Sequence, residues 1–135
     1  MAGTYTSITM VAPDEAAAGS NVPVDITVKN ISSMWYLFVM AALWVDGEYI
    51  SLGALGTGLT LNPGETASVS VSFIMPSKDV VLTGETIVEL DEDYTIIDDT
   101  VTKQVALSVA PPPPPPPPPA EPQFRGFAVK EYTRV

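Results

Sequence analysis

Six carboxylates gather near the end of the β-rich part of the sequence, and they are the residues best suited to chemistry. They are Glu89, Asp91, Glu92, Asp93, Asp98 and Asp99. Hard oxygen ligands bind Ca²⁺ when neighbouring loops bring several of them together. The candidate ligands are therefore Asp91, Asp93, Asp98 and Asp99, although their spacing does not form the D-x-D-x-D-G loop. The alternative is that these acids occupy solvated turns and keep sheet edges from pairing wrongly.

The sequence lacks the side chains on which many enzymes depend. It contains no histidine and no cysteine, so the usual pairs of nucleophile and base are missing, as are thiolate metal sites and disulfides. The serines of residues 66–75 alternate along a strand and show no G-x-S-x-G turn. The three glycines of residues 53–58 do not open a helix after a strand, as a phosphate-binding loop would. We therefore expect no enzymatic activity and no cofactor.

Charge and hydropathy argue against two classes of partner. The net charge of −10 disfavours nucleic acid and anionic membrane surfaces, since both require a basic surface. The longest apolar run, residues 34–45, is much shorter than the roughly 20 residues of a membrane helix. The segment MAGTYTSITM lacks the basic and apolar regions of a secretory signal. This favours either a chain that does not use the general export route or a mature sequence behind an added Met.

Short segments with alternating apolar residues predict an all-β fold, an immunoglobulin-like antiparallel β-sandwich of about seven strands. Residues 4–12 are typical of an edge strand, and residues 14–21 of a polar connection. Residues 22–30, 66–75, 80–90 and 100–109 alternate with a period of two, which predicts half-buried strands. Gly84, inside the third of these segments, indicates a β-bulge. Between the last two segments, residues 94–97 are typical of a short strand, and Asp98-Asp99 indicates a turn after it.

Residues 34–45 (MWYLFVMAALWV) are apolar on both faces. This predicts a central strand that is covered on both sides. One cover is the core, and the other is a neighbouring sheet or another subunit, unless some apolar groups simply stay exposed. Asp46-Gly47 predicts a hairpin turn to a returning strand at residues 48–52. Residues 53–58 are expected to form a flexible loop.

The body resembles the cysteine-free immunoglobulin-like domains related to the CARDB adhesion-type modules of prokaryotes. The matching segments are VPVDITVKNIS at residues 22–32, LNPGETASVSVSF at 61–73 and MPSKDV at 75–80, and the resemblance covers residues 7–109. It implies a domain that serves as a spacer or binding module in surface proteins or virus particles. Such surface proteins are normally long, repeated and exported. This sequence carries one copy and no export signal, which favours the virion.

Nine consecutive prolines, Pro111 to Pro119, separate the body from a short tail. Proline fixes φ and lacks an N–H, so the run forms neither a helix nor an inner strand. It predicts a polyproline II rod of about 28 Å, with Pro111, Pro115 and Pro119 as spacer residues. The predicted parts are the sandwich at residues 1–110, the linker at 111–119 and the docking tail at 120–135. The alternative, an SH3-type ligand, lacks a flanking Arg or Lys.

The tail, residues 123–135 (QFRGFAVKEYTRV), has the character of a strand. Phe127, Val129 and Val135 share one face, whereas Phe124 and Tyr132 share the other. Because a lone strand is not stable, we expect it to add to an open sheet edge of another chain. The alternative is a frayed terminus. The predicted partner-binding residues are Phe124, Arg125, Phe127, Val129, Lys130, Tyr132, Arg134 and Val135.

The charges of the body and the tail have opposite signs. Residues 1–110 hold 14 acidic and 3 basic residues, a net of −11, whereas residues 120–135 hold 3 basic and 2 acidic residues, a net of +1. This favours docking of the tail on another body. If the acceptor is an identical subunit, docking produces a ring or an open filament. If it is a different shell or fibre protein, the chain is an adaptor.

These observations predict a non-enzymatic structural protein, most simply a decoration or fibre-type component of the virion of a prokaryotic virus. The first alternative is a subunit of a filament or adhesion module at the cell surface. The second is a Ca²⁺- or carbohydrate-binding module, in which the aromatic platform consists of Trp35, Tyr36 and Trp44.

Overall fold

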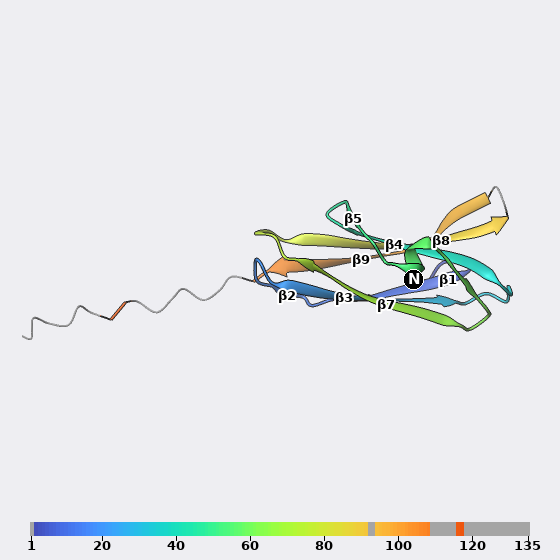
Figure 1. Cartoon of the computed structure of the whole chain (residues 1–135), viewed down its shortest axis with the longest axis horizontal. Helices are drawn as coiled ribbons and strands as arrows, with labels where there is room; N and C mark the ends of the chain where they lie inside the picture. Colours follow the sequence, from blue (N-terminus) through green and yellow to red (C-terminus); the bar gives the residue numbers. More distant parts are fainter. Residues whose placement is uncertain (1, 92–93, 109–115, 118–135) are drawn as a thin grey trace, which may run out of the picture.

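A computed structural model describes residues 2–91, 94–108 and 116–117. It confirms the all-β sandwich of two facing sheets (Figure 1). The smaller sheet is antiparallel, in the order β1 (Thr6–Val11), β3 (Asn21–Asn30) and β7 (Thr66–Ile74). The larger sheet has the order β2 (Glu15–Ala16), β9 (Tyr94–Leu107), β8 (Val80–Asp91), β4 (Leu37–Val45) and β5 (Glu48–Ile50), and β6 (Leu59–Leu61) also pairs with β4.

The core lies between the inward faces of the two sheets. The predicted alternation of β3 is confirmed, because its four inward side chains are fully buried: Val22, Val24, Ile26 and Val28. From the larger sheet, Leu43, Leu82 and Val88 face them in the same cluster. Complete burial of one such side chain stabilises the fold by about 1.5–3 kcal/mol. The two-residue period therefore accounts for the burial of β3, the central strand of the smaller sheet.

Strand β4 begins at Leu37, later than the apolar run suggested. Met34, Trp35 and Tyr36 belong to an exposed loop. Tyr36 has a φ of 59°, which interrupts the extended backbone before the strand can begin. On the outer face of β4, the half-buried Phe38 lies against Gly58 and not against a further sheet.

The predicted hairpin between β4 and β5 is confirmed. Val45 pairs with Glu48 across a two-residue loop. Asp46 and Gly47 both have positive φ, at 50° and 86°. A type I′ hairpin requires this geometry, because its backbone twist matches that of the two strands.

Several predicted connections hold short elements instead. The segment 14–21 contains β2, which pairs in parallel with β9. The expected flexible loop at residues 53–58 contains the one-turn helix α1 (Ala54–Thr57), anchored by the buried Leu55. With β2 and β6, the described residues contain nine strands. β2, α1 and β6 are too short to show a period in the sequence. No helix in the described part of the chain is long and apolar enough to span a membrane.

The predicted bulge at Gly84 is wrong. Gly84 pairs regularly with Leu43 on one side and Val101 on the other. The register shifts between β8 and β9 occur later, between Thr86 and Ile87 and between Glu89 and Asp91. A Cβ at Gly84 would lie 3.3 Å from both Ile8 Cδ1 and Val101 Cγ1. The glycine therefore leaves room for the Ile8 side chain of β1 to pack on β8.

Substitution Gly84→Val tests this packing role. The added side chain must displace Ile8 or Val101, so we expect the free energy of unfolding to fall by about 1–3 kcal/mol. Urea denaturation of the full chain measures it. The control Thr83→Val places the same side chain on the outer face of β8 and should change stability by no more than about 0.5 kcal/mol. Equal effects of the two substitutions would contradict the role assigned to Gly84.

Candidate docking surface

The predicted turn at Asp98-Asp99 is wrong, because β9 runs through both residues without interruption. Thr86 pairs with Asp99 and Ile87 with Ile97, so Asp98 is the extra residue of a β-bulge. A bulge bends its strand and redirects a side chain. The local sequence gives no sign of this, because two adjacent aspartates are also typical of a turn.

The carboxylates of these two residues cap the outer edge of β1. Asp98 accepts hydrogen bonds from the backbone nitrogens of Thr4 at 2.9 Å, Tyr5 at 3.1 Å and Thr6 at 2.7 Å, and from Thr6 Oγ1 at 2.6 Å. Asp99, which is only 7% exposed, accepts from the backbone nitrogen of Ile8 at 2.9 Å. Amides that would otherwise form an open sheet edge are thus satisfied by side chains of the other sheet.

This arrangement bears on the predicted Ca²⁺ ligands. Asp98 and Asp99 are engaged by amide donors, and Asp91 ends β8. Asp93 lies outside the described residues. Within residues 2–91, 94–108 and 116–117, no three His, Cys, Asp or Glu side chains form a group that could hold a metal ion.

The opposite edge of the small sheet, along β7, has no such cap. The backbone nitrogen of Asn30 donates to Glu65, and that of Met75 donates to Ser20. In an antiparallel pair, the amides of one strand point alternately toward and away from its neighbour. These two bonds at the ends of the pair fix that alternation, so the amides of residues 67, 69, 71 and 73 point toward β3. The amides of residues 66, 68, 70, 72 and 74 point outward, and no described residue accepts a hydrogen bond from them.

Strand β7 also lacks the residues that usually protect an edge. Its sequence, TASVSVSFI, contains no charge, no proline and no glycine. Native edge strands are normally blunted by charges, prolines or bulges. The exposed Ile74, at 61%, adds an apolar side chain to the end of this edge. The absence of charge is visible in the sequence, but only the topology identifies β7 as an edge.

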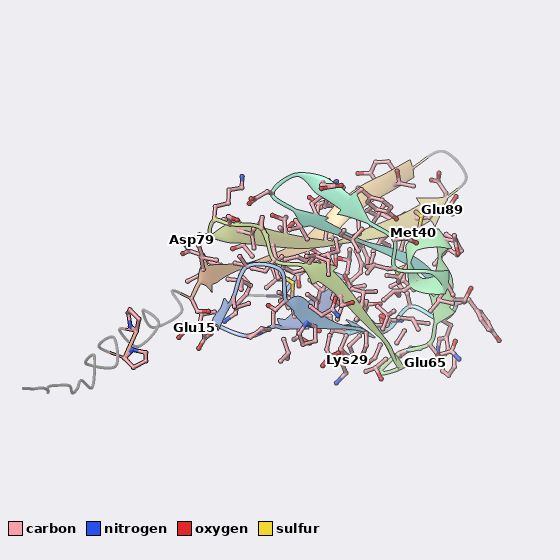
Figure 2. All side chains as sticks on the ribbon, turned by 60° about the vertical axis from the view of Figure 1, so that its left-hand side comes forward. Glu15, Lys29, Met40, Glu65, Asp79 and Glu89 are labelled. Atoms are coloured by element: carbon pink, nitrogen blue, oxygen red, sulfur yellow. The ribbon has the colours of Figure 1, made fainter. Side chains whose placement is uncertain are left out.

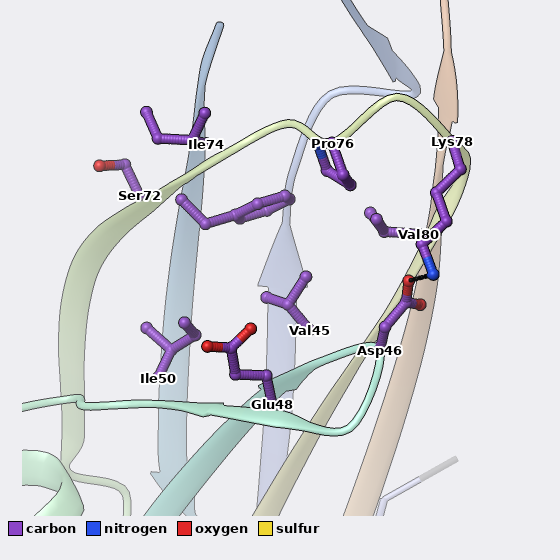
Figure 3. Close-up of a pocket in the computed structure, with 10 residues that line it drawn as sticks. Val45, Asp46, Glu48, Ile50, Ser72, Ile74, Pro76, Lys78 and Val80 are labelled. Carbon is purple, nitrogen blue, oxygen red and sulfur yellow. Dashed lines mark ion pairs between the residues drawn. The ribbon is translucent and has the colours of Figure 1, made fainter. Parts of the chain in front are cut away.

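A groove of about 540 Å³ opens beside the C-terminal end of β7, between β7 and β5 (Figure 3). Apolar side chains from both sheets line it: Val45, Ile50, Phe73, Ile74, Pro76 and Val80. The polar residues are Asp46, Glu48, Ser72 and Lys78. Lys78 Nζ lies 3.3 Å from Asp46 Oδ2, an ion pair drawn in Figure 3. The groove is therefore an apolar trough with an acidic side formed by the β4–β5 hairpin.

Asp46 fixes the position of that hairpin. Its Oδ1 accepts a hydrogen bond of 2.8 Å from the backbone nitrogen of Val81 in β8. This bond, more than the neighbouring Lys78 ammonium, holds the pKa of Asp46 below its ordinary value of 3.8. The ionised carboxylate thus holds the β4–β5 hairpin against β8 of the larger sheet.

The three aromatic residues of the predicted carbohydrate platform do not lie together. Trp35 and Tyr36 precede β4, with ring centroids 6.4 Å apart and exposures of 67% and 74%. Trp44 lies near the other end of β4 and contacts Tyr49, with centroids 6.0 Å apart. Because the strand separates the two pairs, a single platform of Trp35, Tyr36 and Trp44 is not formed.

The predicted linker and tail fall mostly outside the described residues. Pro116 and Pro117 are described and exposed. The predicted spacer residues Pro111, Pro115 and Pro119 lie outside the description, as do all the predicted docking residues: Phe124, Arg125, Phe127, Val129, Lys130, Tyr132, Arg134 and Val135. The rod, the tail and the boundaries of the three parts therefore stay predictions.

Comparison with known proteins rests on structure. No protein-family model matches the sequence, and no curated protein matches it. The crystal structure of the CARDB domain of the PF1109 protein from Pyrococcus furiosus, solved in complex with di-metal ions, is similar to this chain with a TM-score of 0.57 and 14% identity, over 76% of this chain and 94% of that chain. The solution structure of the same domain has a TM-score of 0.56 and 16% identity, over 79% of this chain and 97% of that chain.

The body has a CARDB-like fold. The expected resemblance is confirmed at that level, because both comparison structures are covered almost completely. At 14–16% identity the likeness concerns the fold alone, and a fold by itself does not specify a function.

The capping role of Asp98 predicts a specific loss of stability. Substitution Asp98→Ala removes the acceptor of the Thr4, Tyr5 and Thr6 amides, so we expect the free energy of unfolding to fall by about 1.5–3 kcal/mol, as for hydrogen bonds to a charged group. The control Glu48→Ala removes the same charge from an exposed site and should change stability by about 0.5 kcal/mol or less. Chemical denaturation measures both, and an unchanged Asp98→Ala protein would contradict the cap.

The lowered pKa of Asp46 predicts an effect of acid. A depressed pKa in the folded protein contributes stability above the ordinary pKa of 3.8, and this is lost as the pH falls through the lower folded value. The melting temperature of Asp46→Asn should therefore lie below that of the wild type at pH 7 and approach it as the pH falls below the lowered pKa of Asp46. Because the Val81 amide is the larger cause, Lys78→Gln should retain most of the pH dependence. A constant difference between wild type and Asp46→Asn would refute this assignment.

Proposed function

We propose that this protein is a non-enzymatic structural component that attaches to another protein through its C-terminal tail by strand addition. The observation that carries the proposal is that the core is complete before the prolines begin. Its buried cluster extends from Ile8 to Val105, and the last strand, β9, ends at Leu107. The sandwich therefore does not require the tail, which leaves the strand-like residues 123–135 for a partner.

The proline run fits the same assignment. A polyproline II segment resists collapse and holds its two ends apart. A tail at its far end reaches a neighbouring molecule more readily than its own sandwich. The proposed roles of Pro111, Pro115 and Pro119 are those of a spacer, and the roles of Phe127, Val129 and Tyr132 are those of contact residues in the added strand.

The chemistry of the body supports a structural role over catalysis. The chain has no histidine and no cysteine. The carboxylates of Asp98 and Asp99 accept backbone hydrogen bonds that hold β1, which assigns them to stability. We therefore propose no substrate and no cofactor.

As the setting, we propose the virion of a prokaryotic virus, in which the sandwich is displayed as a decoration or fibre-type component. The support is that a CARDB-like body is followed by a proline run and by a segment whose sequence has strand character. The CARDB-like fold itself also favours a second candidate, a subunit of a cell-surface filament or adhesion module. Both candidates use the same tail, so the experiment below tests their shared feature.

Truncation after Ala110 tests the proposed function. The truncated chain should keep the circular-dichroism spectrum and, within a few degrees, the melting temperature of the full chain, because the core lies before the cut. We expect the full chain to form particles above the mass of a monomer, measured by light scattering and seen in negative stain, and the truncated chain to stay monomeric. As a matched control, Gln123→Ser changes a polar tail residue and should leave assembly intact.

One result would overturn the proposal, and a second would narrow the choice of acceptor. Assembly that persists after truncation would show that the tail is not the docking segment. A full chain that stays monomeric at high concentration would exclude identical subunits as acceptors. In that case only attachment to a different shell or fibre protein would remain.

A further inference from the structure

We propose that the acceptor is the outer edge of β7 in a second copy of this chain. Residues 123–135 of one copy would add as a fourth strand to the small sheet of the next copy, beside β7. The groove between β7 and β5 would then receive the apolar side chains of that strand. This inference rests on the proposed function and specifies where the tail binds.

The choice of β7 follows from a comparison of the strand edges. On β1, the carboxylates of Asp98 and Asp99 already accept hydrogen bonds from the outward amides of Thr6 and Ile8. β2 and β5 have only two and three residues, and β9 carries Asp98, Asp99 and Lys103 along its length. β7 instead offers nine uncharged residues whose outward amides have no acceptor among the described residues. Such an edge is a template for strand addition.

The path of the chain indicates why the tail would come from another copy. The backbone nitrogen of Leu107 donates a 2.7 Å hydrogen bond to Asp79 Oδ1. This places the end of β9 beside the turn between β7 and β8, next to the groove. In Figure 2, Asp79 lies at this end of the sandwich, whereas Glu65, which precedes β7, lies at the other end.

The lengths of the rod and tail then limit binding to the chain's own edge. The predicted rod of about 28 Å would carry residue 120 away from that end, and residues 120–122 would span at most about 10 Å on a return path. Residues 123–128 would therefore cover the remaining distance of about 18 Å, at about 3.3 Å per residue. Only the last residues of the tail could reach the chain's own β7, and Phe124 and Phe127 would stay outside. On a second copy, the whole segment can lie along the nine-residue strand.

The side chains of the tail match the two faces of the extended sheet. Strand β7 turns Phe73 toward the groove, whereas its serines are exposed and Ser72 also borders the groove. An added strand continues this alternation. If Phe127, Val129 and Val135 share the face of the sheet that carries Phe73, Phe127 and Val129 would be the side chains that meet Val45, Ile50 and Phe73 in the groove. The opposite face, which includes Phe124, Ala128, Lys130 and Tyr132, then lies beside the serines.

The charges near the groove are also complementary to the tail. The body near this end presents Asp46, Glu48 and Asp79, whereas its nearby cation, Lys78, is paired with Asp46. The tail brings Arg125, Lys130 and Arg134. Opposite charges at an interface speed association, and salt weakens their attraction. Because each copy would bind the next in the same way, the contact is heterologous and forms a ring or a filament.

Proline at position 72 tests the edge in the full-length chain. The amide of Ser72 points outward, so Ser72→Pro removes no bond to β3, and edge strands tolerate proline at such positions. The ring should block an incoming strand. We expect a melting temperature within a few degrees of the wild type and an increase of at least tenfold in the concentration needed for assembly. The matched control Ser72→Thr keeps the amide and should assemble normally.

Cysteine cross-linking provides a second test that does not depend on proline. The chain has no cysteine, so introduced pairs report only their own proximity. A full-length Ser72→Cys chain, mixed with Ala128→Cys or Lys130→Cys chains and oxidised, should give a disulfide-linked heterodimer, since cross-strand neighbours lie within about 5.5 Å. Val129→Cys, on the opposite face of the added strand, should cross-link at least tenfold less.

The combined outcomes separate this inference from the proposed function. If truncation after Ala110 abolishes assembly but Ser72→Pro does not, and no cross-link forms, the tail docks elsewhere and β7 is excluded. If the truncated chain still dimerises and Ser72→Pro prevents this, the edges of two β7 strands pair with each other. That result would overturn both the proposed docking role of the tail and the proposed binding of the tail to β7. Loss of assembly in both variants, together with the cross-link to Ser72→Cys, supports the inference.

Discussion

The carboxylates of Asp98 and Asp99 form the interaction on which the architecture of the sandwich depends. They extend from the bulged region of β9 in the larger sheet and accept hydrogen bonds from Thr4, just before β1, and from Thr6 and Ile8 of β1 in the smaller sheet. This one contact joins the two sheets along one side and also satisfies amides that a partner strand would otherwise bind. A buried network of this kind stabilises only while every member is satisfied. Thr86 completes it, since its hydroxyl contacts both Thr6 and the backbone of Asp99.

Closure of one edge makes the small sheet asymmetric. On the β1 side, the carboxylates of Asp98 and Asp99 accept hydrogen bonds from outward amides. The β7 side presents outward amides, an uncharged strand and a groove with apolar walls. Helix α1 and its buried Leu55 fill part of the gap between the sheets, and the groove lies where the gap stays open. A protein under selection only for solubility would be expected to protect such an edge. The asymmetry thus gives the proposed assembly a direction.

In this proposal, three parts of one short chain perform three separate tasks. The CARDB-like body supplies a stable sandwich, the proline run keeps distance, and the tail carries strand residues without a sheet of their own. Attachment would then depend on few specific side chains, because backbone hydrogen bonds provide most of the affinity in strand addition. The same parts suit a particle surface or a filament, and the choice between them depends on the acceptor.

The sequence by itself determined the all-β fold, the buried face of β3, the β4–β5 hairpin and the serine-faced strand β7, because a two-residue period and a turn dipeptide are local properties. Tertiary structure decided the features that depend on contacts with other strands. Gly84 proved to be a close approach of β1 and not a bulge, and Asp98 proved to be part of a bulge and not of a turn. Trp35, Tyr36 and Trp44 proved to belong to two separate aromatic pairs. The open edge belongs to this second group. No segment shows from its own residues whether another strand lies beside it, because the order of strands in a sheet is set by contacts between residues far apart in the chain.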